Sequence, residues 1–451
     1  MNVVVSQSSG TLRPLVMLVW PVLAEQLLVM LVGFSDTILA GHYLAPQHLA
    51  AMTLISYMIW FLTNLFSFVA IGAVAMTARF VGAQDWPQAN RVVNQSFLLG
   101  AMLAAVFTTS GLFFGGQLSS LLQLEGESAT LATRYLYCLI AVMPMMMLET
   151  VGNGCLRGAG DMITGLLTMI VVNVVNVAVS WSLLLGLGPL PEMGWDGLAI
   201  GTACGHAIGG LIPLTRLLRG RAGLRIEKSL LVPDRDLMRR ILRIGVPGGI
   251  DTLSITTCQL VFLSMVDRLG TVAAAAHGVA IRVESLAYLP GYAFQLAAAT
   301  LAGQYLGARD YHRANRSVLL ACATSGALML GVSLSFFLFA GPLVDVFLGP
   351  DQDDVAAVAP GLLKIIAVAL PTLALTQVLT GALRGAGDTR WPLVFTFIGF
   401  LMVRLPMTWL VTQRWDWGIE GAWYAMAADI IVRCALITAR FLTGGWKRVE
   451  V

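Results

Sequence analysis

The chain contains two copies of the same pattern. The string FVGAQD at residues 80–85, followed by Ala-Asn-Arg at 89–91, returns in the second half as YLGARD at 305–310, followed by Ala-Asn-Arg at 314–316. A second string, LRGAGD, occurs at 156–161 and again at 383–388. Because the two strings recur at nearly the same spacing, the polypeptide is predicted to consist of two similar halves, as many membrane transporters do.

The composition places the chain in a lipid bilayer. Hydrophobic residues make up 57%, charged residues only 12%, and the mean hydropathy is +0.79, whereas soluble domains carry roughly 25% charged residues. The six cysteines have neither zinc-ligand nor redox spacing, and no cofactor is expected. The first apolar stretch lacks the features of a cleavable signal peptide, so it is expected to be a retained span.

Twelve stretches are long and apolar enough to cross a bilayer, which takes about 20 residues as a helix. Their approximate ranges are 15–40, 49–77, 93–116, 129–153, 162–187, 196–218, 241–266, 272–302, 317–341, 355–382, 391–413 and 418–442. The predicted fold class is therefore an all-α polytopic membrane protein with twelve transmembrane helices in two six-helix bundles.

Loop charges orient these spans, because Lys and Arg accumulate on the cytoplasmic side. Basic residues gather on one side, including Arg79, Arg157, the run Arg216 to Arg243, Arg309 and Arg384, while the opposite loops carry acids such as Glu192, Asp345 and Asp354. We therefore expect a multi-pass protein of the inner (plasma) membrane with both termini in the cytoplasm. We also expect it to be a monomer.

Six spans in each half make the repeat parallel, with a pseudo-two-fold axis along the membrane normal and a solute cleft between the bundles. The expected domains are an N-terminal lobe (1–218), a basic cytoplasmic linker (219–240) and a C-terminal lobe (241–451). The basic charge of the linker favours contact with membrane lipids, and no nucleic acid is expected as a partner.

The first span carries two acids on one face. Glu25 and Asp36 are eleven residues apart, which is about three helical turns and about 16 Å, and no Lys or Arg of the same span can pair with either. A carboxylate that has no cationic partner in an apolar wall takes up a proton or a metal cation. The candidate metal cation is Na+. Asp36 is therefore the predicted ion-coupling residue.

Polar side chains in the fifth predicted span are candidate partners of Asp36. Asn173, Asn176 and Ser180 form one helical stripe of oxygen ligands. They are predicted to complete an oxygen cage around the ion, to hydrogen-bond Asp36, or to pack helices together through interhelical hydrogen bonds.

A further set of residues is predicted to line the substrate cavity. Glu25 aligns with Asp251 in the second half, each four residues after a proline, and we expect the two acids to face each other and attract cationic solutes; Asp36 instead aligns with Phe262. Arg282 and Glu284 do not share a helix face, so each needs its own partner. Asp251 is a candidate partner for Arg282. Met146 and Tyr288 represent the thioether and aromatic side chains of a wall that accepts lipophilic cations.

Two other charged groups have structural interpretations. Asp429 and Arg433 are four residues apart on the last span and are expected to neutralise each other. Glu149 is predicted to form an ion pair near the interface, with Arg157 as a candidate partner.

Three motifs carry a resemblance to a known family: Ser35-Asp36-Thr37 with Ala40-Gly41, the doubled block before Ala-Asn-Arg, and the doubled LRGAGD. Through them, the chain resembles the multidrug and toxic compound extrusion (MATE) family over nearly its whole length. The resemblance implies two six-helix lobes in a V, and cation-coupled (H+ or Na+) antiport that exports organic cations, including aromatic drugs, by alternating access. It maps the family's first-span aspartate onto Asp36 and its fifth-span polar positions onto Asn176 and Ser180.

The chain departs from the family pattern in the second lobe. The acids that one branch places in spans 7 and 10 align near Ile255 and Leu373. Asp251 and Glu284 are therefore candidates to substitute for them, and the coupling ion stays open between H+ and Na+. The alternatives are a flippase for lipid-linked precursors or another solute exporter of the same superfamily. A membrane-embedded transferase is disfavoured because the five histidines form no catalytic motif, and the protein is not expected to be an enzyme.

Overall fold

The computed structural model describes residues 10–121, 126–348 and 352–449, and in these ranges it is helical without a β-strand. The chain divides into two compact units. The first holds Trp20–Gly249, and the second holds Ile250–Val451 together with the start of α1 as far as Val19. Residues 1–9 and 450–451 lie outside the described residues, and the cytoplasmic location of the two termini stays a prediction.

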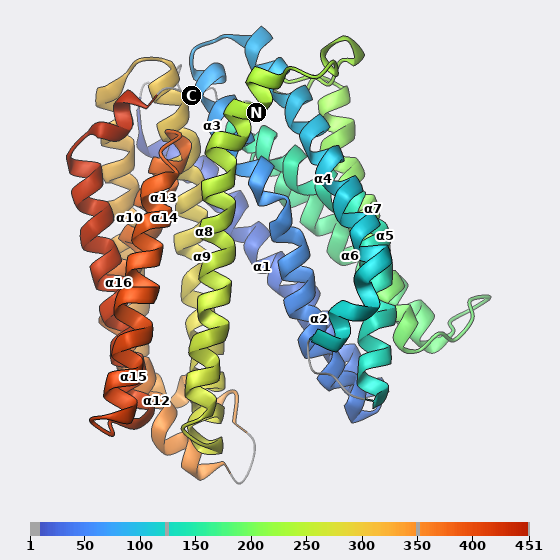
Figure 1. The fold of residues 1–451 in the computed structure, drawn as a ribbon, viewed down its shortest axis with the longest axis vertical. Helices are drawn as coiled ribbons and strands as arrows, with labels where there is room; N and C mark the ends of the chain where they lie inside the picture. Colours follow the sequence, from blue (N-terminus) through green and yellow to red (C-terminus); the bar gives the residue numbers. More distant parts are fainter. Residues whose placement is uncertain (1–9, 122–125, 349–351, 450–451) are drawn as a thin grey trace. The chain divides into compact units, whose positions relative to one another are not determined.

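The first unit is a bundle in which α5 packs against α2, α3, α4 and α7, and α6 packs against α7 (Figure 1). The helices are α1 (Leu12–Tyr43), α2 (Pro46–Leu65), α3 (Ser67–Gly82), α4 (Trp86–Leu121), α5 (Gly126–Gly158), α6 (Ile163–Leu185) and α7 (Trp195–Leu218). Two short 3-10 helices follow, η2 (Arg221–Gly223) and η3 (Lys228–Leu230), and then α8 (Arg235–Asp267), which continues into the second unit.

The second unit packs α9 against α10, α12 and α13, and α16 against α12, α13 and α15. Its elements are α9 (Thr271–Gly307), α10 (Tyr311–Leu338), α11 (Ala340–Asp345), α12 (Asp353–Ala367), α13 (Leu370–Gly385), α14 (Arg390–Phe397), the π-helical turn η4 (Ile398–Arg404), α15 (Leu405–Gln413), α16 (Gly418–Leu442) and η5 (Gly445–Arg448). The core of this unit includes Phe262, Leu362, Trp423 and Met426.

The all-α polytopic fold is confirmed, but not every predicted span is one continuous apolar helix. Among the described residues, nine helices are long and apolar enough to cross a membrane, and a tenth span results if α12 and α13, bent by 51°, count as one. Pro371 in the first turn of α13 explains this bend, because proline lacks the N–H that would continue the helix. The predicted span 49–77 is divided at Phe66, where the Ser67 hydroxyl donates to the Asn64 carbonyl.

The repeated LRGAGD string forms the same structure in each unit. Gly160 and Gly387 both adopt left-handed backbone conformations, with φ of 86° and 87°, which glycine reaches without steric cost. Asp161, the last residue of the first copy, binds Arg221 at 2.7 Å, and Asp388, the last residue of the second, binds Arg440 at 2.8 Å. The duplication therefore fixes turn geometry and ion pairing as well as sequence.

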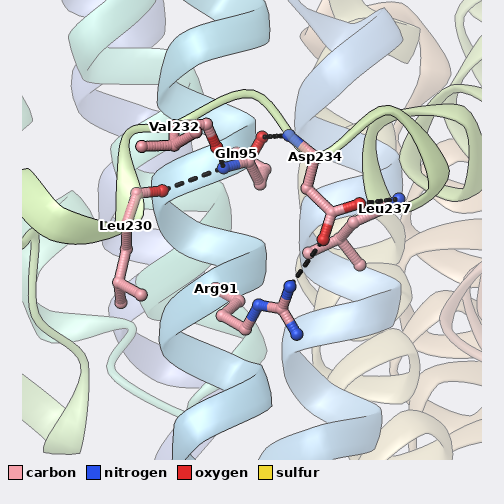
Figure 2. Close-up of polar contacts among 6 residues, drawn as sticks. All are labelled: Arg91, Gln95, Leu230, Val232, Asp234 and Leu237. Carbon is pink, nitrogen blue, oxygen red and sulfur yellow. Dashed lines mark hydrogen bonds and ion pairs between the residues drawn. The ribbon is translucent and has the colours of Figure 1, made fainter.

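The segment between the two halves is bound to α4 by side-chain hydrogen bonds (Figure 2). Gln95 Nε2 donates to the carbonyls of Leu230 and Val232 at 2.9 and 2.8 Å, and its Oε1 accepts from the Asp234 N–H at 2.9 Å. Arg91 also pairs with Asp234 at 2.7 Å. The predicted linker therefore follows a defined path over the first unit.

The second copy of the repeat lacks this anchor. When the two Ala-Asn-Arg strings are aligned, Gln95 corresponds to Leu320. Asn94, which binds the Arg225 carbonyl at 3.0 Å, corresponds to Leu319. Asn94 and Gln95 thus occur only in the copy of the repeat whose side chains bind the linker.

We expect Gln95→Leu to release the linker, because the change removes three hydrogen bonds to its backbone, each worth about 1 kcal/mol. Trypsin should then cut at Arg225 and Lys228 at least about tenfold faster in detergent. Gln88→Leu on the same helix is the matched control, since its side chain makes no hydrogen bond with the described residues. Equal cleavage of both variants and the wild type would contradict the anchoring role.

Candidate ion-coupling site

Asp36 lies in the interior of the first unit, where three neighbouring helices donate hydrogen bonds to it. Its side chain is 1% exposed. Oδ2 accepts from Thr202 of α7 at 2.7 Å and from Tyr135 of α5 at 3.2 Å, and Oδ1 accepts from Asn176 of α6 at 3.2 Å. All three donors are neutral, and no ion pair to Asp36 is present among the described residues. A buried carboxylate in this setting favours binding a proton or a cation.

Two further oxygens near this point of α6 and α7 have unused capacity. Asn176 Oδ1 and Ser180 Oγ are buried without a hydrogen-bond partner. Gly201 of α7 lies against Ser180, since a Cβ at Gly201 would collide with that side chain. A carboxylate with amide and hydroxyl oxygens is a donor set of the kind that hard cations prefer. The described residues contain no cluster of three or more His, Cys, Asp or Glu that would suit another metal.

Asn173 lies apart from Asp36, although the sequence grouped it with Asn176. Its amide nitrogen donates to the carbonyl of Leu28 in α1 at 3.0 Å and to that of Met169 at 2.8 Å. Asn173 therefore faces α1, as Asn176 does, but it binds the α1 backbone about two turns before Asp36.

Sequence reasoning missed two of the three donors to Asp36. Tyr135 and Thr202 are fully buried, and they also bind each other at 2.8 Å. The available signal was a hydroxyl within a mainly apolar span, which is too common in helix packing to single out either residue.

Glu25 and Asp251 are both paired with arginines. Glu25 binds Arg157 of α5, and Asp251 binds Arg384 of α13 at 2.6 Å. The inference that Glu25 lacks a cation was wrong, because another helix supplies it, and Asp251 is not the partner of Arg282. Each pair joins an acid after a proline to the arginine of LRGAGD, so the two copies of the repeat make the same contact.

The other charged groups match the prediction only in part. Asp429 and Arg433 do pair, at 2.8 Å, but Arg404 joins them at 2.7 Å and lies over the ring of Phe400. Glu149 binds His206 of α7 at 2.9 Å, and not the predicted Arg157. Sequence spacing had offered no reason to connect Glu149 with His206.

The remaining predicted cavity residues occupy different environments. Glu284 is buried and has no hydrogen bond or ion pair with a described residue, and Arg404 is close enough to interact with it electrostatically. Arg282 is exposed, Tyr288 is 39% exposed and Met146 is 1% exposed. Their assignment to a substrate cavity stays a prediction.

We expect the Asp251–Arg384 pair to contribute structurally. Asp251→Asn should destabilise the protein by about 3 kcal/mol, because it leaves Arg384 buried without its counter-charge. The double variant with Arg384→Gln should lose less than the sum of the single losses. The measurement is a double-mutant cycle of unfolding in detergent, and additive losses would show that the two groups do not interact.

Comparison with known proteins identifies the family. The sequence profile described as MatE matches residues 21–182 and 247–410. A Thermotoga maritima protein described as "Probable multidrug resistance protein NorM" is 30% identical over 444 residues, 97% of this chain and 94% of that protein.

Solved structures agree in fold. "Crystal structure of MATE in complex with MaL6" has a TM-score of 0.92 and 22% identity, and covers all of both chains. A Pyrococcus furiosus protein, described as a transporter of the MOP superfamily with a binding pocket of reverse polarity, has a TM-score of 0.91 and 21% identity, and covers 100% of this chain and 99% of that one. The chain therefore belongs to the MATE family, and it is a membrane transporter and not an enzyme.

Proposed function

We propose that this protein is a cation-coupled antiporter that exports organic cations, including drugs, by alternating access. The observation that carries the proposal is Asp36, a buried carboxylate held only by neutral donors. The names of the relatives, which describe multidrug resistance proteins, support drug-sized substrates. The coupling ion is H+ or Na+, and both suit a carboxylate beside free amide and hydroxyl oxygens.

The proposed mechanism works through the attachment of α1. Polar contacts tie this helix to the first unit at three points: Glu25 to Arg157, the Leu28 carbonyl to Asn173, and Asp36 to Thr202. Hydrogen bonds to an ionised carboxylate are stronger than those to a neutral one. Binding or release of the coupling ion at Asp36 therefore changes how firmly this part of α1 is held. That change in attachment would couple the ion to the movement of α1.

The site proposed for the organic cation includes Glu284. It is a buried acid of the second unit that forms no ion pair with a described residue, and only Arg404 acts on it without direct contact, so a bound cation would supply a direct counter-charge. The flippase alternative requires buried arginines that are free to bind a pyrophosphate. Arg404 instead binds Asp429 and, at 3.2 Å, Gln259, which favours export of cations.

The proposed setting is the inner membrane. The basic linker and the acidic opposite loops support cytoplasmic termini by the positive-inside rule. Membrane lipids are then the surrounding partners and the transporter acts as a monomer.

We expect Asp36→Asn to abolish gradient-driven ethidium transport in proteoliposomes, because an amide can neither carry a proton nor balance Na+. Imposing H+ and Na+ gradients separately on the wild type identifies the ion. Asp196→Asn is the control, because Asp196 also lies in the first unit but pairs with the exposed Arg134, and it should transport normally. Wild-type rates for Asp36→Asn under both gradients would remove Asp36 from the mechanism.

A further inference from the structure

The second unit contains a counterpart of helix α6 that is one residue longer. Between LRGAGD and a later hydroxyl–tryptophan pair (180–181 in the first half, 408–409 in the second), the second half contains one residue more. The turn η4 accounts for it, because a π-helical turn holds about one residue more than an α-helical turn. Arg404 then corresponds to Asn176, since each precedes the hydroxyl residue of its pair by four positions.

Arg404 contacts the residue that corresponds to Asp36. In the first unit, Asn176 donates to Asp36 Oδ1 at 3.2 Å. In the second unit, Phe262 takes the place of Asp36 when the acids after the prolines are aligned. The guanidinium of Arg404 lies over the ring of Phe262, 5.5 Å from its centroid. The same contact between counterpart helices therefore joins an amide to an acid in one unit and a cation to an aromatic ring in the other.

A glycine contact supports this correspondence. Aligning GWDG at the start of α7 with GIEG at the start of α16 makes Gly209 the counterpart of Arg433. A Cβ at Gly209 would collide with Val172, and a Cβ at Gly399 would collide with Arg433. Gly399 is the counterpart of Val172 when the LRGAGD strings are aligned. Large and small side chains have thus exchanged places across one helix contact that both units make.

The position equivalent to the ion-coupling site is apolar in the second unit. By the same alignment, Thr202, which donates to Asp36, corresponds to Met426. Phe262 and Met426 both belong to the hydrophobic core of the second unit. A ring and a thioether replace the carboxylate and the hydroxyl, so this position offers no oxygen cage for a hard cation.

Arg404 brings a fixed positive charge to this position. Its side chain is 2% exposed and pairs with Asp429 at 2.7 Å, and Asp429 also binds Arg433 at 2.8 and 2.9 Å. Both guanidiniums lie over the ring of Phe400, at 4.4 and 4.9 Å from its centroid, which stabilises cations. Two arginines thus share one carboxylate. Glu284 acts on Arg404 at longer range, without direct contact.

The two units therefore differ in where their positive charge comes from. Asp36 of the first unit has only neutral donors among the described residues. The corresponding place in the second unit already holds a guanidinium that is covalently part of the chain. A further small cation would be repelled there, because like charges interact strongly in a medium of low dielectric constant.

We propose that Arg404 is a permanent counterpart of the coupling ion in the second unit. Its guanidinium occupies the place where the first unit binds H+ or Na+. The second unit then takes up no coupling ion, and each transport cycle exchanges one ion, at Asp36. The proposal rests on the proposed antiport.

The first test measures how many ions are exchanged for each ethidium. The full chain is reconstituted in proteoliposomes whose membrane potential is held at zero with K+ and valinomycin. The logarithm of the steady-state ethidium gradient is plotted against that of the imposed gradient of the driving ion, and the slope is the number of ions per ethidium. We expect a slope of one for the wild type.

The second test is independent of transport and places an acid beside Arg404. Phe262→Asp and Phe262→Asn introduce side chains of similar size that differ in charge, and Arg404 Nε is buried without a hydrogen-bond partner that would compete for it. In detergent, Phe262→Asp should unfold at a temperature at least about 3 °C higher than Phe262→Asn. With Arg404→Asn added to both, the order should reverse, because the introduced acid then lacks its cation.

The same variants supply a matched pair for the ion count. Phe262→Asp with Arg404→Asn recreates the acid and amide of the first unit, so its slope should rise to two. Phe262→Asp alone should keep a slope of one, since Arg404 neutralises the new acid. If the double variant does not fold, as judged by size-exclusion chromatography, the wild-type slope and the order of the two single variants decide the test.

Each contrary outcome has a separate meaning. A wild type that accumulates no ethidium under an H+ or a Na+ gradient would overturn the antiport, and the one-ion stoichiometry with it. Accumulation with a slope of two would overturn the stoichiometry and leave the antiport standing. Equal unfolding temperatures of the two single variants, or an order that persists after Arg404→Asn, would overturn the placement of the positive charge.

Discussion

A carboxylate inside a membrane protein must be compensated, and the structure of the first unit depends on how the two acids of α1 are compensated. Glu25 receives a full positive charge from Arg157, whereas Asp36 receives only neutral donors from Thr202, Tyr135 and Asn176. An ion-paired acid has little reason to bind a further cation, while an acid with neutral donors retains its demand for one. This difference separates an acid that is neutralised by an ion pair from the acid that we propose for ion coupling on the same helix.

The internal repeat shows which contacts serve both halves and which serve one. The arginine of LRGAGD binds an acid after a proline in each unit, and the aspartate of the string binds a second arginine. These contacts hold helix ends in place in both copies. The copies diverge at contacts that only the first half makes. Gln95 anchors the linker and corresponds to Leu320, and Asp36 corresponds to Phe262.

The sequence predicted the helical fold and the duplication, because hydropathy and repeated strings act over long segments. It predicted the contacts of individual polar groups less well. Asn173 shares a helical stripe with Asn176 but binds the α1 backbone, and Glu149 binds His206, 57 residues further along the chain. Periodicity within one helix cannot show which face of another helix lies opposite.

The sequence by itself therefore determined that the chain is a duplicated, membrane-embedded helical protein whose first span carries two acids. Apolar composition and spacing are sufficient for this, since only helices of adequate length satisfy their backbone groups in lipid. Only the tertiary structure decided which acids are neutralised. Glu25 and Asp36 look equivalent along α1, and they differ because an arginine of α5 reaches one of them and a threonine of α7 reaches the other.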